Sequence, residues 1–354
     1  MKCCKYLILP LLWLSVFPIV SLRAQSLSND RGSRRGMLSD IKNDIKKNYF
    51  DPNFKGFDLE VKFKNADEKI KQATSMGQMN AIIAQFMVDF DDSHLFFIPP
   101  GKANRSDYGF DMRMIGGKCY VVSIDEKSDA ARKGLAVGDE IYSIDGFAPL
   151  RETFWKIDYF YRSLSPRPQV KLDITKPDGT ELGIIVNTKI IVGRLTSGGI
   201  GDMGQTIRDN DDTYNRAVKQ YFYEKTPGLF IWKMPHFSLE PSRVDSIMDK
   251  VKDSALVLDL RGNSGGRVDM VLRLLGNFFA EETKVYDEKS RKETKAVFAK
   301  LRSKDVFGGK LVVIIDSQSA SASEIFSKVI QLEKRGVIIG DTSAGAVIGC
   351  ARSR

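Results

Sequence analysis

The sequence predicts a multidomain α+β protein with a helical N-terminal domain, a β-rich domain and a C-terminal α/β core with a mainly parallel sheet. Apolar residues recur at helical spacings between Met37 and Phe90, and short β-type runs separated by glycine turns fill residues 107–190. Strand and helix patterns alternate after residue 191, which calls for crossover connections and a parallel sheet. With 354 residues, 42% of them hydrophobic and 28% charged, the chain can bury several cores. This composition excludes disordered, collagen-like and multispanning membrane proteins.

Residues 1–24 are predicted to be a secretory signal peptide. Lys2 and Lys5 precede an almost wholly apolar run at 7–20, and Ala24 offers a small residue before a cut preceding Gln25. The run is shorter than the roughly 20 residues needed to span a bilayer, so an uncleaved anchor is the weaker interpretation. We therefore expect an exported protein of the periplasm or cell envelope, or a secreted one, with no stable membrane span after cleavage.

Charge and cysteine content indicate neither a nucleic-acid partner nor a cofactor. The formal net charge of +9 falls by three to +6 when the bases of the signal peptide are removed, and the densest basic cluster, 284–310, alternates with acidic residues. Only Cys119 and Cys350 follow the signal peptide, without the spacing of a disulfide framework or a zinc site. We expect no nucleic acid, no metal and no organic cofactor, and the sequence indicates no oligomeric state.

The first domain after the signal peptide, expected over 25–106, is helical. Its residues 26–36 are polar and basic and are expected to form a loose leader. Helical spacing follows, most clearly in Met79, Ile82, Ile83, Phe86 and Met87. The domain closes with Asp91-Asp-Ser-His94, after which the apolar stretch Leu95–Ile98 is expected to be a strand.

The β-rich domain, expected over 107–190, contains β-type runs at 119–123, 140–144 and 170–174. Its segment 128–146 resembles a PDZ domain, and Tyr108-Gly109-Phe110 lies where such domains keep their carboxylate-binding loop. PDZ domains bind C-terminal peptides as an added strand, so the resemblance makes Tyr108, Gly109 and Phe110 candidate peptide-binding residues. A PDZ-like fold with a blocked groove is the alternative.

The C-terminal core, expected over 191–354, alternates strands and helices. Strands are expected at 255–260, 310–316 and 337–340, and helices at 268–279 and 323–333. The glycine-rich turn 261–266 follows the first of these strands. In an open parallel sheet, chemistry lies at the carboxyl ends of the strands, so the turns that follow them are the candidate site.

Ser321 lies in one such turn, Ser317-Gln-Ser-Ala-Ser-Ala-Ser-Glu-Ile325. A small-residue turn between a strand and a helix exposes a hydroxyl and points backbone N–H groups toward nearby negative charge. The alternative is a capping box, in which Ser321 and Glu324 only satisfy the start of the helix.

The neighbouring turn, Arg261-Gly-Asn-Ser-Gly-Gly266, places bare glycines where a substrate carbonyl can approach main-chain donors. The alternative is a turn that leads into a helix and needs positive φ. A nucleotide-phosphate loop is disfavoured, because neither G-x-G-x-x-G nor a Walker lysine is present.

Asp259-Leu-Arg-Gly-Asn-Ser-Gly-Gly266 and Ser319-Ala-Ser-Ala-Ser-Glu-Ile325, preceded by the PDZ-like segment, resemble the C-terminal processing (tail-specific) serine peptidases. The resemblance implies a ClpP/crotonase-like α/β core and a serine-type endopeptidase that cleaves peptides or proteins. It makes Ser321 the nucleophile, and the amides of Ala322 and of Gly265 or Gly266 the oxyanion hole.

The general base departs from the better-known branch of this family, which has a lysine 25 residues after the serine. That position holds Ala346, which cannot accept a proton. The segment Asp91-Asp-Ser-His94 instead resembles the histidine-bearing segment of the tricorn-protease-like branch, which implies His94 as the base and a part for Ser93. A structural role for His94 is the alternative, and His236 is taken as structural.

The chain ends 33 residues after Ser321, and residues 349–354 are expected to be an interrupted strand. The tricorn-like branch draws its orienting acidic residue from several dozen residues beyond the serine, so we expect a core that is incomplete at its C-terminus. Two other functions stay open. One is a catalytically inactive peptide-binding protein on a peptidase scaffold; the other, which leaves more of the motifs unexplained, is an acyl-thioester enzyme with the same kind of sheet.

Overall fold

The computed structural model describes residues 17–99, 104–165, 167–192, 221–291, 293–302 and 306–347. The chain forms two compact units, which divide between Phe97 and Ile98. Most of the expected signal peptide and residues 349–354 lie outside the described residues, so both remain predictions. Among the helices that are described, none has the length and apolar character needed to cross a membrane.

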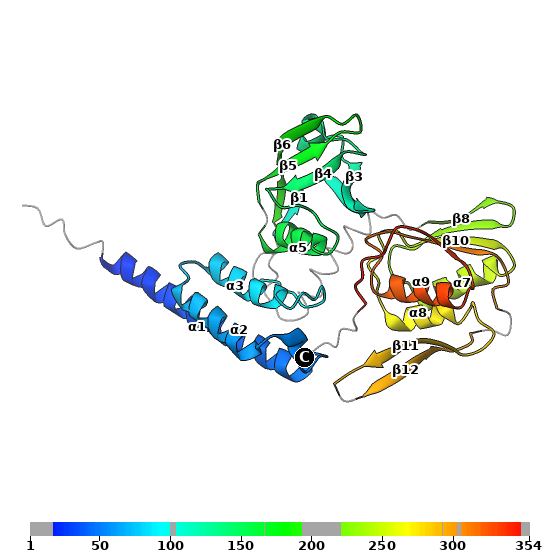
Figure 1. Ribbon diagram of the computed structural model, residues 1–354, viewed down its shortest axis with the longest axis horizontal. Helices are drawn as coiled ribbons and strands as arrows, with labels where there is room; N and C mark the ends of the chain where they lie inside the picture. The colour runs from blue at the N-terminus through cyan, green and yellow to red at the C-terminus, as the bar shows by residue number, and fades with distance from the viewer. Residues whose placement is uncertain are drawn as a thin grey trace, which may run out of the picture. The chain divides into compact units, whose positions relative to one another are not determined.

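The first unit is a bundle of three helices, drawn in blue and cyan in Figure 1. They are α1 (Phe17–Asn48), α2 (Leu59–Gln72) and α3 (Met76–Val88), with the short helix η1 (Phe54–Gly56) before α2. Helix α2 begins at Asp58, whose carboxylate accepts the N–H groups of Glu60 and Val61, and α3 begins at Ser75, whose hydroxyl accepts the Gln78 N–H. The bundle buries an apolar core that includes Leu38, Ile70, Met79 and Ile83.

The loose leader expected at 26–36 is wrong, because these residues belong to helix α1. Their basic side chains hold the helix to its neighbours: Arg31 Nε donates to the Ala73 carbonyl (3.0 Å), and Arg35 forms a bidentate pair with Asp67 (2.6 and 3.2 Å). The strand expected at Leu95–Ile98 is also absent; this described segment has no regular secondary structure. This apolar run is therefore an irregular connection and not a strand.

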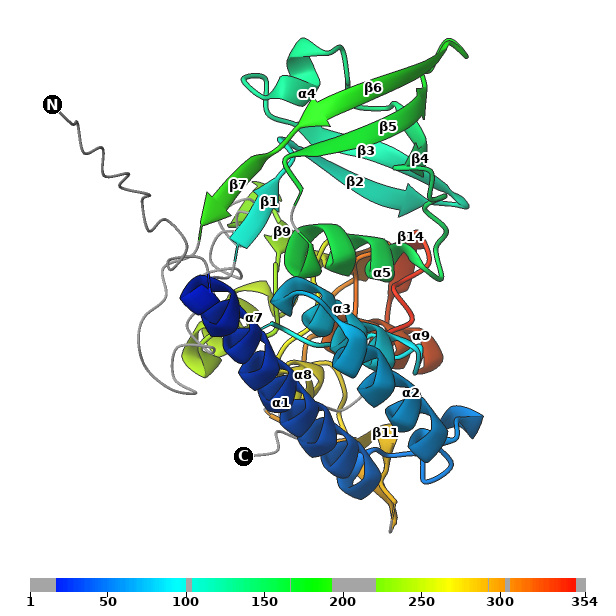
Figure 2. The same cartoon turned by 90° about the vertical axis from the view of Figure 1, so that its left-hand side faces the viewer.

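The second unit begins with a β-rich module, residues 104–192. Its antiparallel sheet has the order β2-β3-β4-β5-β6, and Figure 2 shows α4 and α5 on opposite sides of it. The strands are β2 (Phe110–Ile115), β3 (Lys118–Ile124), β4 (Glu140–Ile144), β5 (Gln169–Thr175) and β6 (Glu181–Asn187). The helices are α4 (Asp129–Arg132), α5 (Phe154–Tyr159) and the π-helical turn η2 (Phe160–Leu164), and β1 (Asn104–Asp107) pairs with β7 (Lys189–Val192). The three strands expected from the sequence are confirmed.

The core of the second unit is a five-stranded sheet in the order β14-β13-β10-β9-β8. Its strands are β8 (Tyr221–Thr226), β9 (Leu229–Lys233), β10 (Ala255–Asp259), β13 (Leu311–Ile315) and β14 (Val337–Gly340). Strands β9, β10, β13 and β14 are parallel, and β8 is antiparallel to β9. The predicted mainly parallel sheet is therefore confirmed.

Helices α7 (Pro241–Val251), α8 (Val268–Leu275) and α9 (Ala322–Leu332) pack against this sheet (Figure 1). Helix α8 ends before residue 279, where the sequence pattern placed its end. At Gly276 an added Cβ would lie 2.1 Å from the Lys300 carbonyl oxygen, so the chain turns there against another main-chain segment. The charged segment near 284–310 contains an unexpected hairpin of β11 (Thr283–Lys289) and β12 (Thr294–Ala299).

Candidate active site

Ser321 occupies a strained turn between β13 and α9. Its backbone has φ 54° and ψ −113°, a conformation that non-glycine residues rarely adopt. A nucleophilic serine on a sharp turn from a strand to a helix has its hydroxyl exposed at the edge of the sheet. Such strain persists only where the surrounding structure holds it, so the contacts of this turn must stabilise the conformation of Ser321.

The capping box predicted as the alternative for Ser321 is present. The Ser321 N–H donates to Glu324 Oε2 (2.8 Å), and the Glu324 N–H donates to the Ser321 carbonyl oxygen (3.0 Å). The other half of the box, the approach of the Ser321 side chain to the Glu324 N–H, is also present. Ser321 therefore caps α9, and a role as nucleophile depends on the strain and the neighbours of its turn.

The glycine-rich turn lies directly against Ser321. A Cβ added to Gly265 would lie 2.8 Å from Ser321 Cβ and 3.1 Å from Ala322 N, and Gly265 has φ +105°. Gly266, with φ +143°, forms a parallel bridge with Phe237, whose carbonyl oxygen would be 2.6 Å from an added Cβ. Both glycines are needed because two main chains approach each other here without room for a side chain.

The three predicted oxyanion donors differ in their hydrogen bonding. The Gly265 N–H donates to Asn263 Oδ1 (2.9 Å). In the part of the chain that the structure describes, neither the Gly266 nor the Ala322 N–H has a hydrogen-bond acceptor. Of the two glycine alternatives left open by the sequence, Gly266 is the one whose N–H has no acceptor among the described residues.

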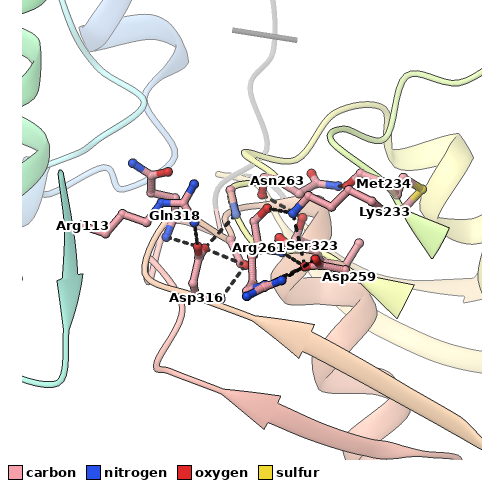
Figure 3. A network of polar contacts seen from close by, with 12 residues as sticks. Arg113, Lys233, Met234, Asp259, Arg261, Asn263, Asp316, Gln318 and Ser323 are labelled. Atoms are coloured by element: carbon pink, nitrogen blue, oxygen red, sulfur yellow. Dashed lines mark hydrogen bonds and ion pairs between the residues drawn. The ribbon is translucent and has the colours of Figure 1, made fainter. Parts of the chain in front are cut away.

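Asn263 joins the two turns. Its fully buried side chain donates from Nδ2 to the Met234 carbonyl (2.8 Å). The main-chain carbonyl of Asn263 accepts hydrogen bonds from the Ala320 N–H and the Ser323 hydroxyl, both at 2.9 Å. Figure 3 shows this asparagine among the polar groups of the network. The sequence pattern contained Asn263 but gave no sign of this role, because its partners come from two other segments, one after β9 and one at the start of α9.

Two buried aspartates fix the first half of the glycine-rich turn (Figure 3). Asp316 Oδ1 accepts the Gly262 N–H (2.8 Å), and its Oδ2 is paired with the Arg113 guanidinium from strand β2. Asp259 pairs with Lys233 (3.2 Å) and with Arg261 (2.8 Å). Asp259 is the last residue of β10 and Asp316 directly follows β13, and both bind the glycine-rich turn after β10.

The buried charges have shifted pKa values. Burial alone raises the pKa of Asp259, but the Arg261 hydrogen bonds and the Lys233 charge outweigh it and hold that pKa below its usual range. Burial lowers the pKa of Lys233, although Asp259 acts in the opposite direction. No group of three or more His, Cys, Asp or Glu side chains within the described ranges could hold a metal ion.

The loop after β14 is held to the Ser321 turn by one carboxylate. Glu324 Oε1 accepts the Ser343 hydroxyl (2.8 Å) and the Gly345 N–H (2.7 Å), and Oε2 accepts the Ala346 N–H (2.9 Å) in addition to that of Ser321. Ala346, at the position that holds lysine in the better-known branch, is therefore tied to the Ser321 turn through its main-chain N–H.

His94 and Ser93 lie together in the first unit. Ser93 Oγ is 3.3 Å from His94 Nδ1, and the His94 N–H donates to Asp92 Oδ1 (2.9 Å). Because His94 belongs to the first compact unit and Ser321 to the second, the predicted meeting of these two side chains remains a prediction. His236 Nδ1 accepts the Ser238 N–H (3.2 Å), which suits the structural role expected for it.

The candidate peptide-binding residues lie at the start of β2. Tyr108 and Phe110 are largely buried and line an apolar pocket with residues of β2, β4, β5, α5 and η2. Its other lining residues are Met112, Ile144, Ile157, Asp158, Tyr161, Val170 and Leu172. The Gly109 N–H donates to Asp107 Oδ1 (3.0 Å), so this amide has an intramolecular acceptor.

Comparison with known proteins identifies a family match in the C-terminal part and relatives that align over longer stretches. Residues 231–352 match the family described as Peptidase family S41. The tail-specific protease of Haemophilus influenzae is 30% identical over 151 residues, which cover 39% of this chain and 21% of that protein. The carboxy-terminal-processing protease of Bartonella bacilliformis is 27% identical over 253 residues, 69% of this chain and 52% of that protein. The carboxy-terminal processing protease CtpB of Bacillus subtilis is 26% identical over 284 residues, 78% of this chain and 54% of that protein.

The chain thus spans about half or less of the length of these curated relatives. Among solved structures, mature CPAF complexed with lactacystin has a TM-score of 0.65 at 14% identity, over 90% of this chain and 85% of that chain. Mature CPAF alone has a TM-score of 0.66 at 15% identity, over 90% of this chain and 84% of that chain. At such identity the likeness concerns the fold. The predicted resemblance to the C-terminal processing peptidases is confirmed by the family match and these relatives, whereas the PDZ domain and the tricorn-like branch remain predictions.

Proposed function

Because this chain contains a peptidase family S41 domain, we propose that it is an exported serine-type endopeptidase that cleaves peptides or proteins, guided by a PDZ domain. Its substrates would be C-termini or unfolded segments, since curated relatives are named as carboxy-terminal processing and tail-specific proteases. The expected signal peptide supports a place in the periplasm or cell envelope, or secretion.

One observation carries the proposal: Ser321 has a strained backbone at the end of a core strand, and the glycine-rich turn contacts it. Strained serines on strand-to-helix turns are typical of nucleophiles, and the strain has no evident use in a residue that only caps a helix. The Gly266 and Ala322 N–H groups, which lack acceptors in the described part of the chain, add the donors that acyl transfer needs.

In the proposed reaction, Ser321 Oγ attacks the carbonyl carbon of the scissile peptide while His94 Nε2 takes the hydroxyl proton. The oxyanion of the tetrahedral intermediate accepts the N–H groups of Ala322 and Gly266. The imidazolium then protonates the leaving amine, and the C–N bond breaks to give the acyl-enzyme. Water, deprotonated by His94, hydrolyses the ester and restores Ser321. Ser93 Oγ orients the ring through Nδ1.

In the proposed PDZ domain, a substrate segment would pair with the edge of β2 that faces away from β3, its sheet neighbour among the described strands. The apolar pocket beside Tyr108 and Phe110 would take one side chain of the bound segment. Backbone pairing of this kind recognises an extended segment with little regard for its sequence, and the pocket supplies selectivity.

The test is covalent labelling by a fluorophosphonate probe, which reacts with activated serines. The wild type should be labelled, whereas Ser321→Ala and His94→Ala should each lose labelling. Ser317→Ala, in the same turn, and His236→Ala, the second histidine, are the matched controls and should label normally. Labelling that survives both Ser321→Ala and His94→Ala rejects the assignment.

A further inference from the structure

A buried carboxylate that the proposed reaction does not use lies two residues before His94. Asp92 is 3% exposed, and both of its oxygens are engaged. Oδ1 accepts the His94 N–H (2.9 Å), and Oδ2 accepts the Tyr49 hydroxyl (3.0 Å). The side chain therefore connects the main chain of His94 with the residue that follows helix α1.

The Tyr49 end of this connection is closely packed. The Tyr49 ring packs edge-on against Phe90 with 5.4 Å between centroids, and Phe90 also contacts Phe57 (5.6 Å) and Phe86 (6.0 Å). Tyr49 and Phe90 are almost fully buried. Burial and the neighbouring Asp92 carboxylate both raise the pKa of Tyr49, so its hydroxyl stays protonated and able to donate.

The chain between Phe90 and Leu95 is held at further points. Asp91 has φ +50°, a left-handed conformation uncommon for residues other than glycine. Lys55 Nζ donates to the Asp91 carbonyl (2.8 Å), and the Leu95 N–H donates to the Asp92 carbonyl (3.0 Å). The first bond comes from η1 and the second from the residue that follows His94. Together they hold the strained conformation of Asp91 in place.

The position of the His94 imidazole depends on this backbone. His94 Nδ1 lies 3.3 Å from Ser93 Oγ, and within the described residues the ring makes no other hydrogen bond. Nε2 is thus the nitrogen left for a reacting group. A ring presented in this way keeps its direction only as long as the main chain of His94 keeps its place.

We propose that Asp92, anchored by Tyr49, is the positioning residue of His94: it fixes the backbone that carries the base, while Ser93 sets the ring. The inference rests on the proposed function, in which His94 is the base. It gives the catalytic histidine an acidic partner from its own segment, acting on the main chain rather than on the ring.

A merely structural turn is the competing explanation, because an Asp side chain that accepts the N–H two residues later forms a common turn. The two explanations differ in what substitution changes. A structural role predicts lower stability alone, whereas positioning predicts a slower reaction at Ser321 and a changed environment of the His94 ring. Displacement of a catalytic group by 1 Å can reduce rate by about 10².

The experiment measures the second-order rate of fluorophosphonate labelling in the full chain, together with thermal unfolding. Asp92→Ala is expected to slow labelling by about 10- to 100-fold. The labelling rate of Asp92→Asn should stay within about threefold of wild type. Its Oδ1 still accepts the His94 N–H, and its NH₂ group can donate a hydrogen bond to the Tyr49 hydroxyl. Asp89→Asn, which changes a half-exposed carboxylate in the preceding turn, is the matched control and should label normally.

NMR gives a readout that does not depend on catalysis, because the chain contains only two histidines. In Asp92→Ala the imidazole C2–H signal of His94 should shift or broaden, and that of His236 should stay unchanged. If Asp92→Ala does not fold, Tyr49→Phe, which removes one donor and keeps the ring, should show the same changes at smaller size.

Folded Asp92→Ala, or in its place Tyr49→Phe, with wild-type labelling and an unchanged His94 signal would overturn the positioning role. Failure of the proposed function looks different: His94→Ala would label like wild type, or wild type would not label at all. In either of those cases the NMR comparison alone decides whether Asp92 fixes His94.

Discussion

Replacing Gly265 by alanine is expected to disable the active site while leaving the fold in place. The new Cβ would lie 2.8 Å from Ser321 Cβ and 2.9 Å from the Ala320 carbonyl oxygen. The first distance is 0.6 Å below the 3.4 Å at which ordinary contact begins, so the two turns must separate. Alanine at φ +105° adds backbone strain of about 1–3 kcal/mol.

Separation of the turns moves the Gly266 N–H away from that of Ala322, and loss of one oxyanion donor costs about 10²–10³ in rate. We therefore expect fluorophosphonate labelling of Ser321 to slow by about 10²–10³, and the melting temperature to fall by roughly 2–12 °C. Gly228→Ala is the matched control, since Gly228 has φ +76° but nothing within 4 Å of an added Cβ.

The control separates strain from position: Gly228→Ala should lower stability and label at the wild-type rate. Gly265→Ala that is destabilised but labelled as fast as wild type would refute the reasoning. It would mean that the contact between the two turns does not set the geometry of acyl transfer.

Three further predictions concern charges and a thiol. Glu324→Ala removes the acceptor of four donors, so we expect the free energy of unfolding to fall by about 3 kcal/mol or more and fluorophosphonate labelling to be lost. Glu324→Gln should be intermediate in both. Urea unfolding measures the change in stability, and an unchanged stability of Glu324→Ala would contradict the prediction. Because the folded pKa of Asp259 lies below its unfolded value of about 3.9, its charge stabilises the protein above that pH, and this contribution is lost as pH falls through the folded pKa. Asp259→Asn should therefore flatten the acid dependence of stability in urea titrations at pH 7, 4 and 2.5; a variant as acid-sensitive as wild type counts against the paired state. Burial raises the pKa of Cys119 from 9.0 to about 12, so stability should decline as pH rises above 9. At pH 8 a chain whose other cysteines are replaced by serine should react with Ellman's reagent only after unfolding; rapid reaction of the native protein would exclude the buried thiol.

Strands β10, β13 and β14 of the core sheet could be predicted from the sequence because their apolar runs are continuous and bounded by glycine or by charged residues, whereas β8 and β9 were not expected. Strand β14, and β4 in the β-rich module, were expected at the residues where the structure has them. The leader at 26–36 was misjudged because a basic, polar stretch looks solvated when its partners are unknown. Arg31 and Arg35 find those partners, Ala73 and Asp67, more than thirty residues away.

The candidate site could be predicted only in part, for the same reason. Local motifs singled out Ser321 and the glycine-rich turn, and the close approach at Gly265 agrees with them. Nothing local indicated that Asn263 would bridge Met234 and Ser323, or that Lys233 would pair with Asp259. Hydrogen bonds between segments far apart in sequence leave no periodic pattern.

These long-range bonds share a physical feature, the burial of a carboxylate that needs several donors. Asp259, Asp316 and Glu324 are buried carboxylates, and burial of an unpaired charge is strongly unfavourable. Each is compensated by several donors, and for Asp316 one of them, Arg113, comes from the β-rich module. Partial packing would leave at least one carboxylate without donors, so we expect the strained Ser321 turn and its neighbour to form cooperatively. Through Arg113, the β-rich module contacts Asp316 directly, and Asp316 is the carboxylate that accepts the Gly262 N–H.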